Sequence, residues 1–177
     1  MLLHYKIIEE RFSDNKVLEM IVAHHRNKHE HKQCISRAKS RFNGRLGEMG
    51  KTIGINDEPV LQLLLSNHRA FSAYDLAEVL SKIEKRIQPI QIYRSLEKLM
   101  ALGAVHRLST KNRFVACYED GNCTAGQFLI CDKCDSVQEI DSKLLDKEIQ
   151  DLAQKNNFSI SRKSVEVQGL CNNCKQI

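Results

Sequence analysis

Apolar residues recur at helical spacing in three consecutive segments of the middle of the chain. The first begins just after Asp57, the second just after Ser72, and the third at Pro89 and runs to about Leu102. Ser72 is a favourable N-cap, proline is common in the first turn of a helix, and Gly103 suits the residue that follows a helix. The pattern predicts three short amphipathic helices.

The pattern changes from helical to alternating after Gly103. Two short extended segments, 104–108 and 113–118, flank a polar turn at 110–112, which is typical of a β-hairpin. Three helices followed by a hairpin indicate a winged helix-turn-helix, in which the third helix enters the major groove of DNA and the wing contacts phosphates. The candidate DNA contacts are Tyr74 at the start of the second helix, Gln91, Arg94 and Lys98 on the outer face of the third, and Lys111 and Arg113 in the wing.

The distribution of charge suits a nucleic-acid partner. The whole chain carries a formal net charge of +5. Residues 35–116 hold 14 Lys and Arg against 7 Asp and Glu, whereas residues 117–177 hold 7 against 10. A basic module followed by a slightly acidic one fits a polyanion bound by the first. The alternative is that these charges, Arg94 and Lys98 included, form an ordinary solvated surface.

The last third of the chain has the pattern of a small mixed unit. It predicts strands at 127–130 and 137–140, a helix from Ser142 to about Asn157, and a strand over 158–167. A unit with so few strands leaves sheet edges open and needs a partner surface. We therefore expect an α+β fold with a C-terminal dimerisation domain. The apolar residues expected on the inner face of its helix are Leu145, Ile149 and Leu152.

Two Cys-x-x-Cys pairs lie in this last third, Cys131/Cys134 and Cys171/Cys174, with 36 residues between them. Zinc takes four ligands tetrahedrally, and a tight turn aims both sulfurs of such a pair at one point, so the pairs predict one structural zinc site. The chain has seven cysteines and no segment resembling a signal peptide. We therefore expect a cytoplasmic protein whose cysteines bind metal, and no membrane segment, since no apolar run approaches about 18 residues.

An enzymatic alternative is a thiol–disulfide oxidoreductase. The reactive cysteine of such an enzyme opens a helix, whereas Cys131-x-x-Cys134 precedes a predicted strand and is matched by a second pair. No nucleophile–base pair, phosphate loop or paired-carboxylate motif stands out in the sequence. We therefore expect a protein that is not an enzyme and has no small-molecule substrate.

His106, Cys117, Cys123 and Glu139 form a second set of possible metal ligands. His106 lies in the predicted wing and Cys117 at its exit, so both belong to the DNA-binding domain or its hinge, whereas Cys123 lies in the crossover and Glu139 in the C-terminal domain. A metal bound by all four would fix the angle between the two domains. Two thiolates, an imidazole and a carboxylate suit zinc better than iron(II) or manganese. The alternative is that Cys117 is a buried core residue and His106 a structural residue of the wing.

The first part of the chain is the least informative. It ends in a histidine-rich segment around residues 24–31, which could bind metal or could be a flexible arm. A basic helix is predicted over 34–45. The expected organisation is an extension at 1–33, a winged-helix domain at 34–116, a hinge at 117–126 and a dimerisation domain at 127–177.

Four motifs occur in order along residues 57–174. They are Ser72-Ala-Tyr74-Asp-Leu, Pro89-Ile-Gln-Ile-Tyr93-Arg94-Ser-Leu96, Leu102-Gly103-Ala-Val105-His106-Arg107 and the two Cys-x-x-Cys pairs. In combination they resemble the ferric uptake regulator superfamily of bacterial metalloregulators, and most closely its zinc uptake regulator branch.

The resemblance implies a homodimer with N-terminal winged-helix domains that bind operator DNA, with Tyr74 and Arg94 touching it. It implies a zinc-responsive repressor of zinc-uptake genes; the alternative is an iron- or peroxide-responsive regulator of the same superfamily. It also implies two zinc ions per chain. The structural zinc would be held by Cys131, Cys134, Cys171 and Cys174, and the regulatory zinc by His106, Cys117, Glu139 and a crossover ligand, here Cys123.

Overall fold

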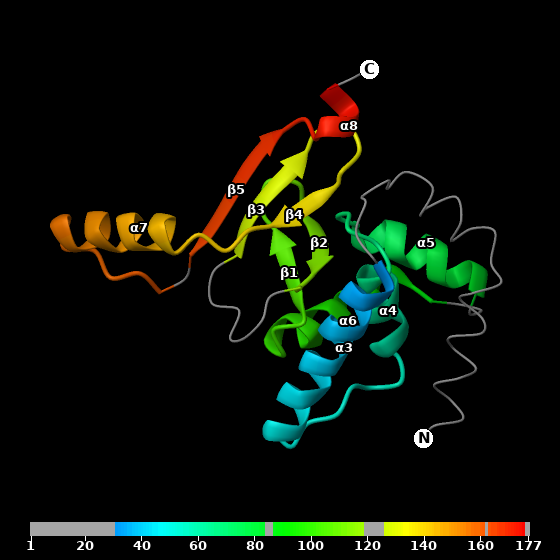
Figure 1. The fold of residues 1–177 in the computed structure, drawn as a ribbon. Coiled ribbons are helices and arrows are strands. Elements are labelled where there is room, and N and C mark those ends of the chain that lie inside the picture. The colour runs from blue at the N-terminus through cyan, green and yellow to red at the C-terminus, as the bar shows by residue number, and fades with distance from the viewer. Residues whose placement is uncertain (1–30, 84–86, 119–125, 162, 176–177) are drawn as a thin grey trace.

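The computed structural model describes residues 31–83, 87–118, 126–161 and 163–175. A largely helical region and a region built on a three-stranded sheet meet along a central seam (Figure 1). The histidine-rich segment before residue 31 and the candidate ligand Cys123 lie outside the described residues. Among the residues that are described, no helix is both long and apolar enough to cross a membrane.

The N-terminal region is a winged helix-turn-helix, as the sequence predicts. Helices α4 (Glu58–Leu65), α5 (Ala73–Ile83) and α6 (Pro89–Ala101) are followed by the antiparallel hairpin of β1 (Val105–Leu108) and β2 (Arg113–Ala116). The helices bury the apolar stripes that the helical spacing predicts. The most deeply buried side chains of this core include Leu63, Leu64, Leu76, Leu80, Ile92, Leu96 and Leu99.

Local signals in the sequence set the ends of two of these helices. At the start of α5, the Ser72 hydroxyl accepts the backbone N–H of Asp75 at 3.1 Å, and the Asp75 carboxylate accepts the backbone N–H of Ser72 at 2.9 Å. This exchange satisfies two donors that a helix start leaves without partners. Gly103 has a φ of 68°, the left-handed conformation that commonly follows a helix end. Both predicted end signals are confirmed.

The helix that precedes this domain is longer than predicted. The sequence predicts a basic helix over 34–45, whereas α3 spans His31–Glu48. Ala38, Phe42 and Leu46 are buried against the core at a spacing of four residues. The helix continues past the predicted end because this apolar side packs along its whole length.

The C-terminal region contains a sheet with the strand order β4-β3-β5. The central strand β3 (Gly126–Cys131) is antiparallel to β4 (Val137–Glu139) and parallel to β5 (Ser164–Gly169). Between β4 and β5 the chain forms α7 (Lys143–Lys155), which projects away from the sheet (Figure 1). The short helix α8 (Asn172–Lys175) follows β5.

Helix α7 begins as predicted but has only part of the predicted packing. The Ser142 hydroxyl accepts the backbone N–H of Leu145 at 3.3 Å, which confirms the N-cap. Of the residues predicted to face inward, Leu145 and Ile149 are half-buried and Leu152 is 55% exposed, and no residue of α7 is fully buried within the described chain. The apolar face of α7 is therefore available to a surface outside this chain.

The last strand starts later than predicted. The sequence predicts a strand over 158–167, but β5 begins at Ser164. Asn157 adopts a left-handed φ of 53° after α7, and the following residues return to the sheet before pairing starts. The predicted start is wrong because the alternation of Phe158 and Ile160 does not reflect burial in this chain, where both side chains are exposed.

The two regions meet at a seam that is centred on residues 68–71. These residues connect α4 to α5 and pair with strands of both regions. They make one β-bridge to Phe114 in β2 and one to Ser136 beside β4. The backbone N–H of Ala70 also donates across the seam to the carbonyl of Asp135 at 3.0 Å. The wing and the C-terminal sheet are therefore connected by backbone pairing. A small apolar core lies in the same seam and consists of Ala70, Leu108, Val115, Phe128, Ile130 and Val137.

Candidate metal centres and DNA-binding surface

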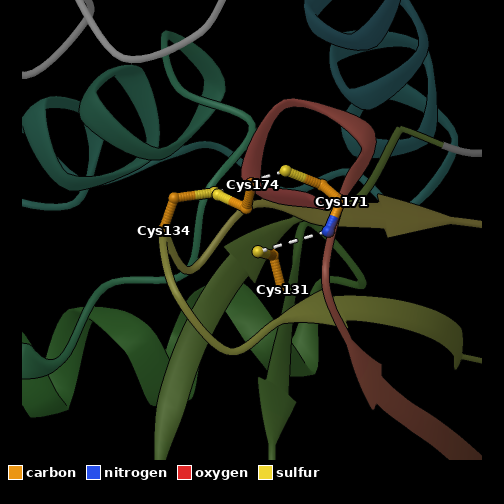
Figure 2. A group of neighbouring side chains, drawn as sticks. All are labelled: Cys131, Cys134, Cys171 and Cys174. Atoms are coloured by element: carbon orange, nitrogen blue, oxygen red, sulfur yellow. Dashed lines mark hydrogen bonds between the residues drawn. The ribbon is translucent and has the colours of Figure 1, made fainter. Parts of the chain in front are cut away.

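The four cysteines of the two Cys-x-x-Cys pairs converge at one end of the sheet (Figure 2). Cys131 is the last residue of β3, and its neighbour in the parallel strand β5 is Gly169, so strand pairing brings the two pairs together. All four sulfurs lie within 4.8 Å of one another, and those of Cys134 and Cys171 are 3.8 Å apart. Sulfurs placed tetrahedrally about 2.3 Å from zinc are about 3.8 Å apart, so this four-cysteine site fits a zinc ion.

The surroundings of Cys131 favour a thiolate. Burial alone raises the pKa of its thiol, but backbone N–H groups of Cys171, Cys134 and Lys133 outweigh burial and lower the pKa to about 6. One of these donors, the N–H of Cys171, lies 3.4 Å from the Cys131 sulfur. Since the thiolate is the form that binds metal, the backbone is arranged to support a metal ligand at this position.

A second group of possible ligands lies at the seam. His106 in β1, Cys117 just after β2 and Glu139 at the end of β4 have ligand atoms within 4.8 Å of one another. His106 Nε2 lies 3.2 Å from a carboxylate oxygen of Glu139, whose other oxygen accepts the backbone N–H of Tyr118 at 3.0 Å. We call His106, Cys117 and Glu139 the hinge triad. Two of its members come from the winged-helix region and one from the C-terminal region.

The hinge triad is largely shielded from solvent. The side chains of His106 and Glu139 are 16% and 7% exposed, and Cys117 is buried. Burial lowers the pKa of His106, but the side chains of Cys117 and Glu139 outweigh it and raise the pKa to about 9. Because metal ligands bind in their deprotonated forms, a metal ion at this site competes with that proton.

One thiolate, one imidazole and one carboxylate are a ligand set that zinc accepts. The convergence of all three groups favours the ligand interpretation of Cys117 and His106 over purely structural roles. The fourth predicted ligand, Cys123, lies outside the described residues, so its place in the site stays a prediction.

The predicted DNA contacts at the helix-turn-helix lie mostly on open surface. Tyr74 at the start of α5 is 66% exposed, and Arg94 on α6 is exposed. Lys98 lies 3.4 Å from Asp57, and its side chain is 64% exposed. The amide oxygen of the exposed Gln91 accepts the backbone N–H at the start of α6 at 2.8 Å, so this oxygen serves as a helix cap.

Lys111, whose predicted contact with DNA stays a prediction, is engaged by carboxylates of the C-terminal region. Its ammonium is 3.1 Å from Asp135 and 3.3 Å from Asp132, and its side chain is only 21% exposed. The wing turn folds back toward the C-terminal region, where these carboxylates attract its positive charge. The sequence reasoning missed both aspartates. An available signal was the pair of acidic residues within and just after Cys131-x-x-Cys134, in a chain whose wing is basic.

The chain is similar to known regulatory proteins. Residues 54–168 match the model of the ferric uptake regulator family. The zinc uptake regulation protein of Escherichia coli (strain K12) is 32% identical over 120 residues, which cover 67% of this chain and 70% of that protein. The peroxide-responsive repressor PerR of Staphylococcus epidermidis is 27% identical over 135 residues, which cover 74% and 86%.

Solved structures match over most of the chain. A zinc uptake regulator complexed with zinc and DNA aligns with a TM-score of 0.72 at 27% identity, covering 84% of this chain and 97% of that one. The holo form of XcZur aligns with a TM-score of 0.70 at 28% identity, covering 81% and 99%.

Proposed function

The chain belongs to the ferric uptake regulator family, and we propose that it is a zinc-responsive transcriptional repressor that binds operator DNA as a dimer. As a member of this family it is a transcription regulator and not an enzyme. When zinc is plentiful, the regulatory site fills and the dimer binds upstream of zinc-uptake genes in the cytoplasm. When zinc falls, the site empties and repression ends.

The observation that carries this proposal is the placement of the hinge triad across the seam. Since His106 and Cys117 belong to the winged-helix region and Glu139 to the C-terminal region, a metal held by all three ties the regions together. A ligand shifts a conformational equilibrium only as far as it prefers one state, and couplings of about 1–3 kcal/mol change affinity roughly 5–150-fold. We expect hinge zinc to raise operator affinity within this range.

The likeness to the zinc- and DNA-bound regulator supports a DNA-competent arrangement of this chain. It covers most of the chain, and a different angle between the two regions would lower the agreement over so long an alignment. We infer that the winged-helix and C-terminal regions are related here as they are in the DNA-binding form. The metals that would stabilise this form are one closed zinc at the four-cysteine site and one exchangeable zinc at the hinge, two per chain.

Zinc is favoured over iron by the residues themselves. Thiolates select zinc, whereas carboxylates suit harder ions, and the hinge triad includes a cysteine. The alternative is an iron- or peroxide-responsive regulator, to which the PerR likeness corresponds. The zinc uptake regulation protein is the more similar of the two curated relatives described, at 32% against 27% identity.

Exposed apolar residues support the dimer. They lie on α7, on β5 and in the segments around them, and a single chain leaves them in water. A concentration of large exposed apolar residues on neighbouring segments is typical of protein–protein contacts. A second copy of this chain is the proposed partner. The residues are Leu144, Leu152, Phe158, Ile160, Val167 and Leu170.

The proposal is tested by metal content and DNA binding in one preparation. Zinc per chain and oligomeric state are measured before and after a mild chelator wash, and binding is followed on a duplex selected from a random pool by the zinc-loaded protein. We expect about two zinc ions to fall to one, with the dimer intact, and selective binding to be lost and then restored by added zinc. One zinc throughout, with none taken up on titration, would refute zinc sensing, and restoration by iron(II) alone would favour the alternative.

A further inference from the structure

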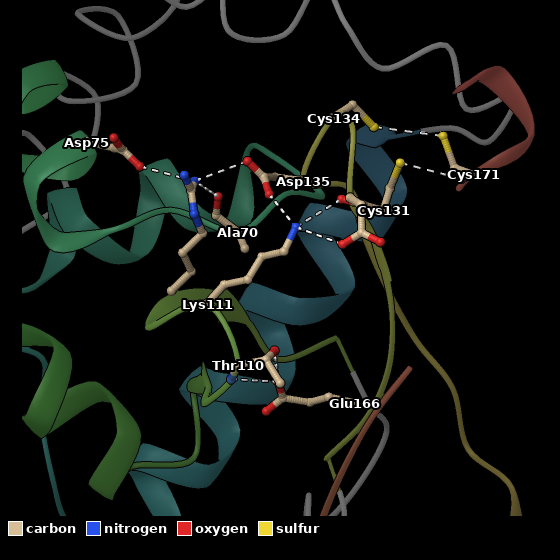
Figure 3. A network of polar contacts seen from close by, with 11 residues as sticks. Ala70, Asp75, Thr110, Lys111, Cys131, Cys134, Asp135, Glu166 and Cys171 are labelled. Atoms are coloured by element: carbon tan, nitrogen blue, oxygen red, sulfur yellow. Dashed lines mark hydrogen bonds and ion pairs between the residues drawn. The ribbon is translucent and has the colours of Figure 1, made fainter. Parts of the chain in front are cut away.

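Carboxylates of the C-terminal region hold the wing at several points (Figure 3). On β5, Glu166 accepts the backbone N–H of Thr110 at 3.1 Å and also accepts its hydroxyl. Lys111, the next residue of the wing turn, pairs with Asp135 and Asp132. These contacts engage the ammonium of Lys111, the basic residue of the wing turn, and tie that turn to the C-terminal region.

Asp135 lies at the centre of this network. One of its carboxylate oxygens is 3.1 Å from the Lys111 ammonium, and the other is 3.4 Å from the guanidinium of Arg113. The same guanidinium nitrogen lies 3.2 Å from Asp75, whose carboxylate caps α5. A continuous series of ion pairs therefore connects the turn that carries Cys134 to the start of α5. Tyr74, which is exposed, lies in the first turn of that helix.

The backbone indicates that the carboxylate of Asp135 has a purpose of its own. Its φ is 56°, in the left-handed region that glycine adopts freely and that costs other residues roughly 1–2 kcal/mol. The turn uses this residue through its backbone N–H, which donates to the carbonyl of Cys131 at 3.1 Å. Glycine would provide the same N–H without strain. The carboxylate of Asp135 is therefore not needed for the turn and is free to serve the contacts across the seam.

The charges of the network are partly removed from water. The side chains of Lys111, Asp135 and Arg113 are 21%, 23% and 26% exposed, so salt screens their attraction less than that of fully exposed pairs. The Lys111 ammonium is held by two carboxylates, those of Asp135 at 3.1 Å and of Asp132 at 3.3 Å.

We propose that Asp135, Lys111 and Arg113 form a charge bridge that positions the winged-helix domain for DNA binding and links the four-cysteine site to the DNA-binding helices. The bridge lies apart from the hinge triad and closes the seam at the opposite end of the wing strands. Its three members are positioning residues that do not themselves touch DNA. In so far as it concerns DNA, the inference rests on the proposed function. The consequence is that the turn of the structural zinc contributes to operator affinity as well as to folding.

The test uses the full-length zinc-loaded dimer and four variants. Asp135→Asn removes the charge and keeps a residue that tolerates the left-handed backbone, and Asp135→Gly removes the side chain while relieving strain. Lys111→Met removes the other half of the bridge. Lys147→Met is the matched control, because Lys147 is exposed on α7 of the same C-terminal region, belongs to neither candidate metal centre, and its loss changes the charge equally. Each is measured for operator binding, salt dependence, zinc content and melting temperature.

A further readout does not depend on DNA. The backbone N–H of Val137 donates across the seam to the carbonyl of His68 at 3.0 Å, so its hydrogen exchange reports opening of the seam. We expect Asp135→Asn and Lys111→Met each to speed this exchange and to weaken operator binding about tenfold. The double variant should bind no more weakly than either single one, because the two residues act through one bridge. Zinc content should stay at the wild-type value.

The most discriminating variant is Asp135→Gly. The bridge predicts weaker operator binding with an unchanged or higher melting temperature, while Lys147→Met behaves as wild type. Wild-type operator affinity in Asp135→Gly would overturn the bridge. The bridge would also be overturned if Lys111→Met weakened binding to all sequences and lowered the slope of log binding constant against log salt concentration by about one. Lys111 would then be a phosphate contact. If the wild-type protein selected no duplex, the proposed function would fall, and unchanged Val137 exchange in Asp135→Asn would separately overturn the bridge.

Discussion

The two candidate metal centres are built in opposite ways. The four-cysteine site takes all its ligands from the C-terminal region, where the pairing of β3 with β5 brings two turns together. The hinge triad takes ligands from β1, from the end of β2 and from β4, on both sides of the seam. A metal inside one region can stabilise that region, whereas a metal across two regions can also select their arrangement. The distribution of ligands along the fold, more than their chemistry, separates a structural centre from a sensing one.

The seam explains why a sensing metal needs to supply little free energy. Six apolar residues are buried there, and fully burying one large apolar side chain contributes about 1.5–3 kcal/mol. Backbone pairing through residues 68–71 adds to this contact. The two regions therefore attract each other before a metal binds. A coupling of about 1–3 kcal/mol from the hinge metal adds to this contact and changes operator affinity roughly 5–150-fold.

The largest effect is expected from breaking the four-cysteine site. Cys134→Ser removes one of four ligands, and structural zinc contributes roughly 10–16 kcal/mol to the folding of small zinc domains, which exceeds the stability of an ordinary domain. We expect loss of this zinc, unfolding of the C-terminal region and loss of the dimer. Metal analysis and size-exclusion chromatography measure the outcome. A stable dimer without this zinc would show that the sheet folds without its metal.

Breaking the hinge triad should leave the fold intact. Cys117→Ser replaces a buried thiol by a hydroxyl of similar size, so we expect a folded dimer that keeps one zinc per chain. Operator affinity should fall roughly 5–150-fold and no longer respond to zinc, because the coupling through the hinge is lost. Fluorescence anisotropy at several free zinc concentrations measures this. A protein that unfolds on purification would instead place Cys117 in the core, and the contrast between the two centres would fail.

A variant of the DNA-binding surface separates metal sensing from DNA contact. Arg94→Ala should weaken binding to the selected duplex by about 1–3 kcal/mol, with little change in non-specific binding, because base contacts carry the sequence information. Both zinc ions should remain, since Arg94 lies on α6 and outside both candidate centres. Lys82→Ala on α5 is the control for loss of one positive charge. An equal loss on all sequences would make Arg94 a phosphate contact.

Much of the fold and the convergence of the four cysteines could be predicted because the signals are local. Ser72, Gly103 and Ser142 mark helix ends within a few residues of themselves, and the Cys-x-x-Cys spacing specifies a metal turn. The partners of the wing could not be predicted in this way. Lys111 meets Asp135 across 24 positions of sequence, and Thr110 meets Glu166 across 56. Only the folded seam brings them together, and neither spacing nor periodicity encodes such a contact.

The packing of α7 shows a different reason for failure. The sequence predicts an inner face of Leu145, Ile149 and Leu152, and the helix forms, yet in a single chain Leu152 is exposed and the other two are only half-buried. The prediction of an apolar face concerns the helix itself, whereas the surface that covers it belongs to another molecule in the proposed dimer. A sequence pattern therefore gives the face and not its partner.

The smallest effect is expected from a helix cap. Ser72→Ala removes the hydroxyl that caps α5, at a cost of about 1 kcal/mol, while the Asp75 carboxylate still accepts the backbone N–H of residue 72. We expect the melting temperature to fall by roughly 4–8 °C, as measured by calorimetry of the zinc-loaded protein. Both zinc ions and the response of DNA binding to zinc should persist. Zinc binding at the hinge depends on how the two regions are arranged and not on the stability of one of them. Loss of the hinge zinc in this variant would show that the sensing centre depends on the stability of the winged-helix domain. The hinge triad and the four-cysteine site would then both depend on the stability of a single region, and the contrast between them would be lost.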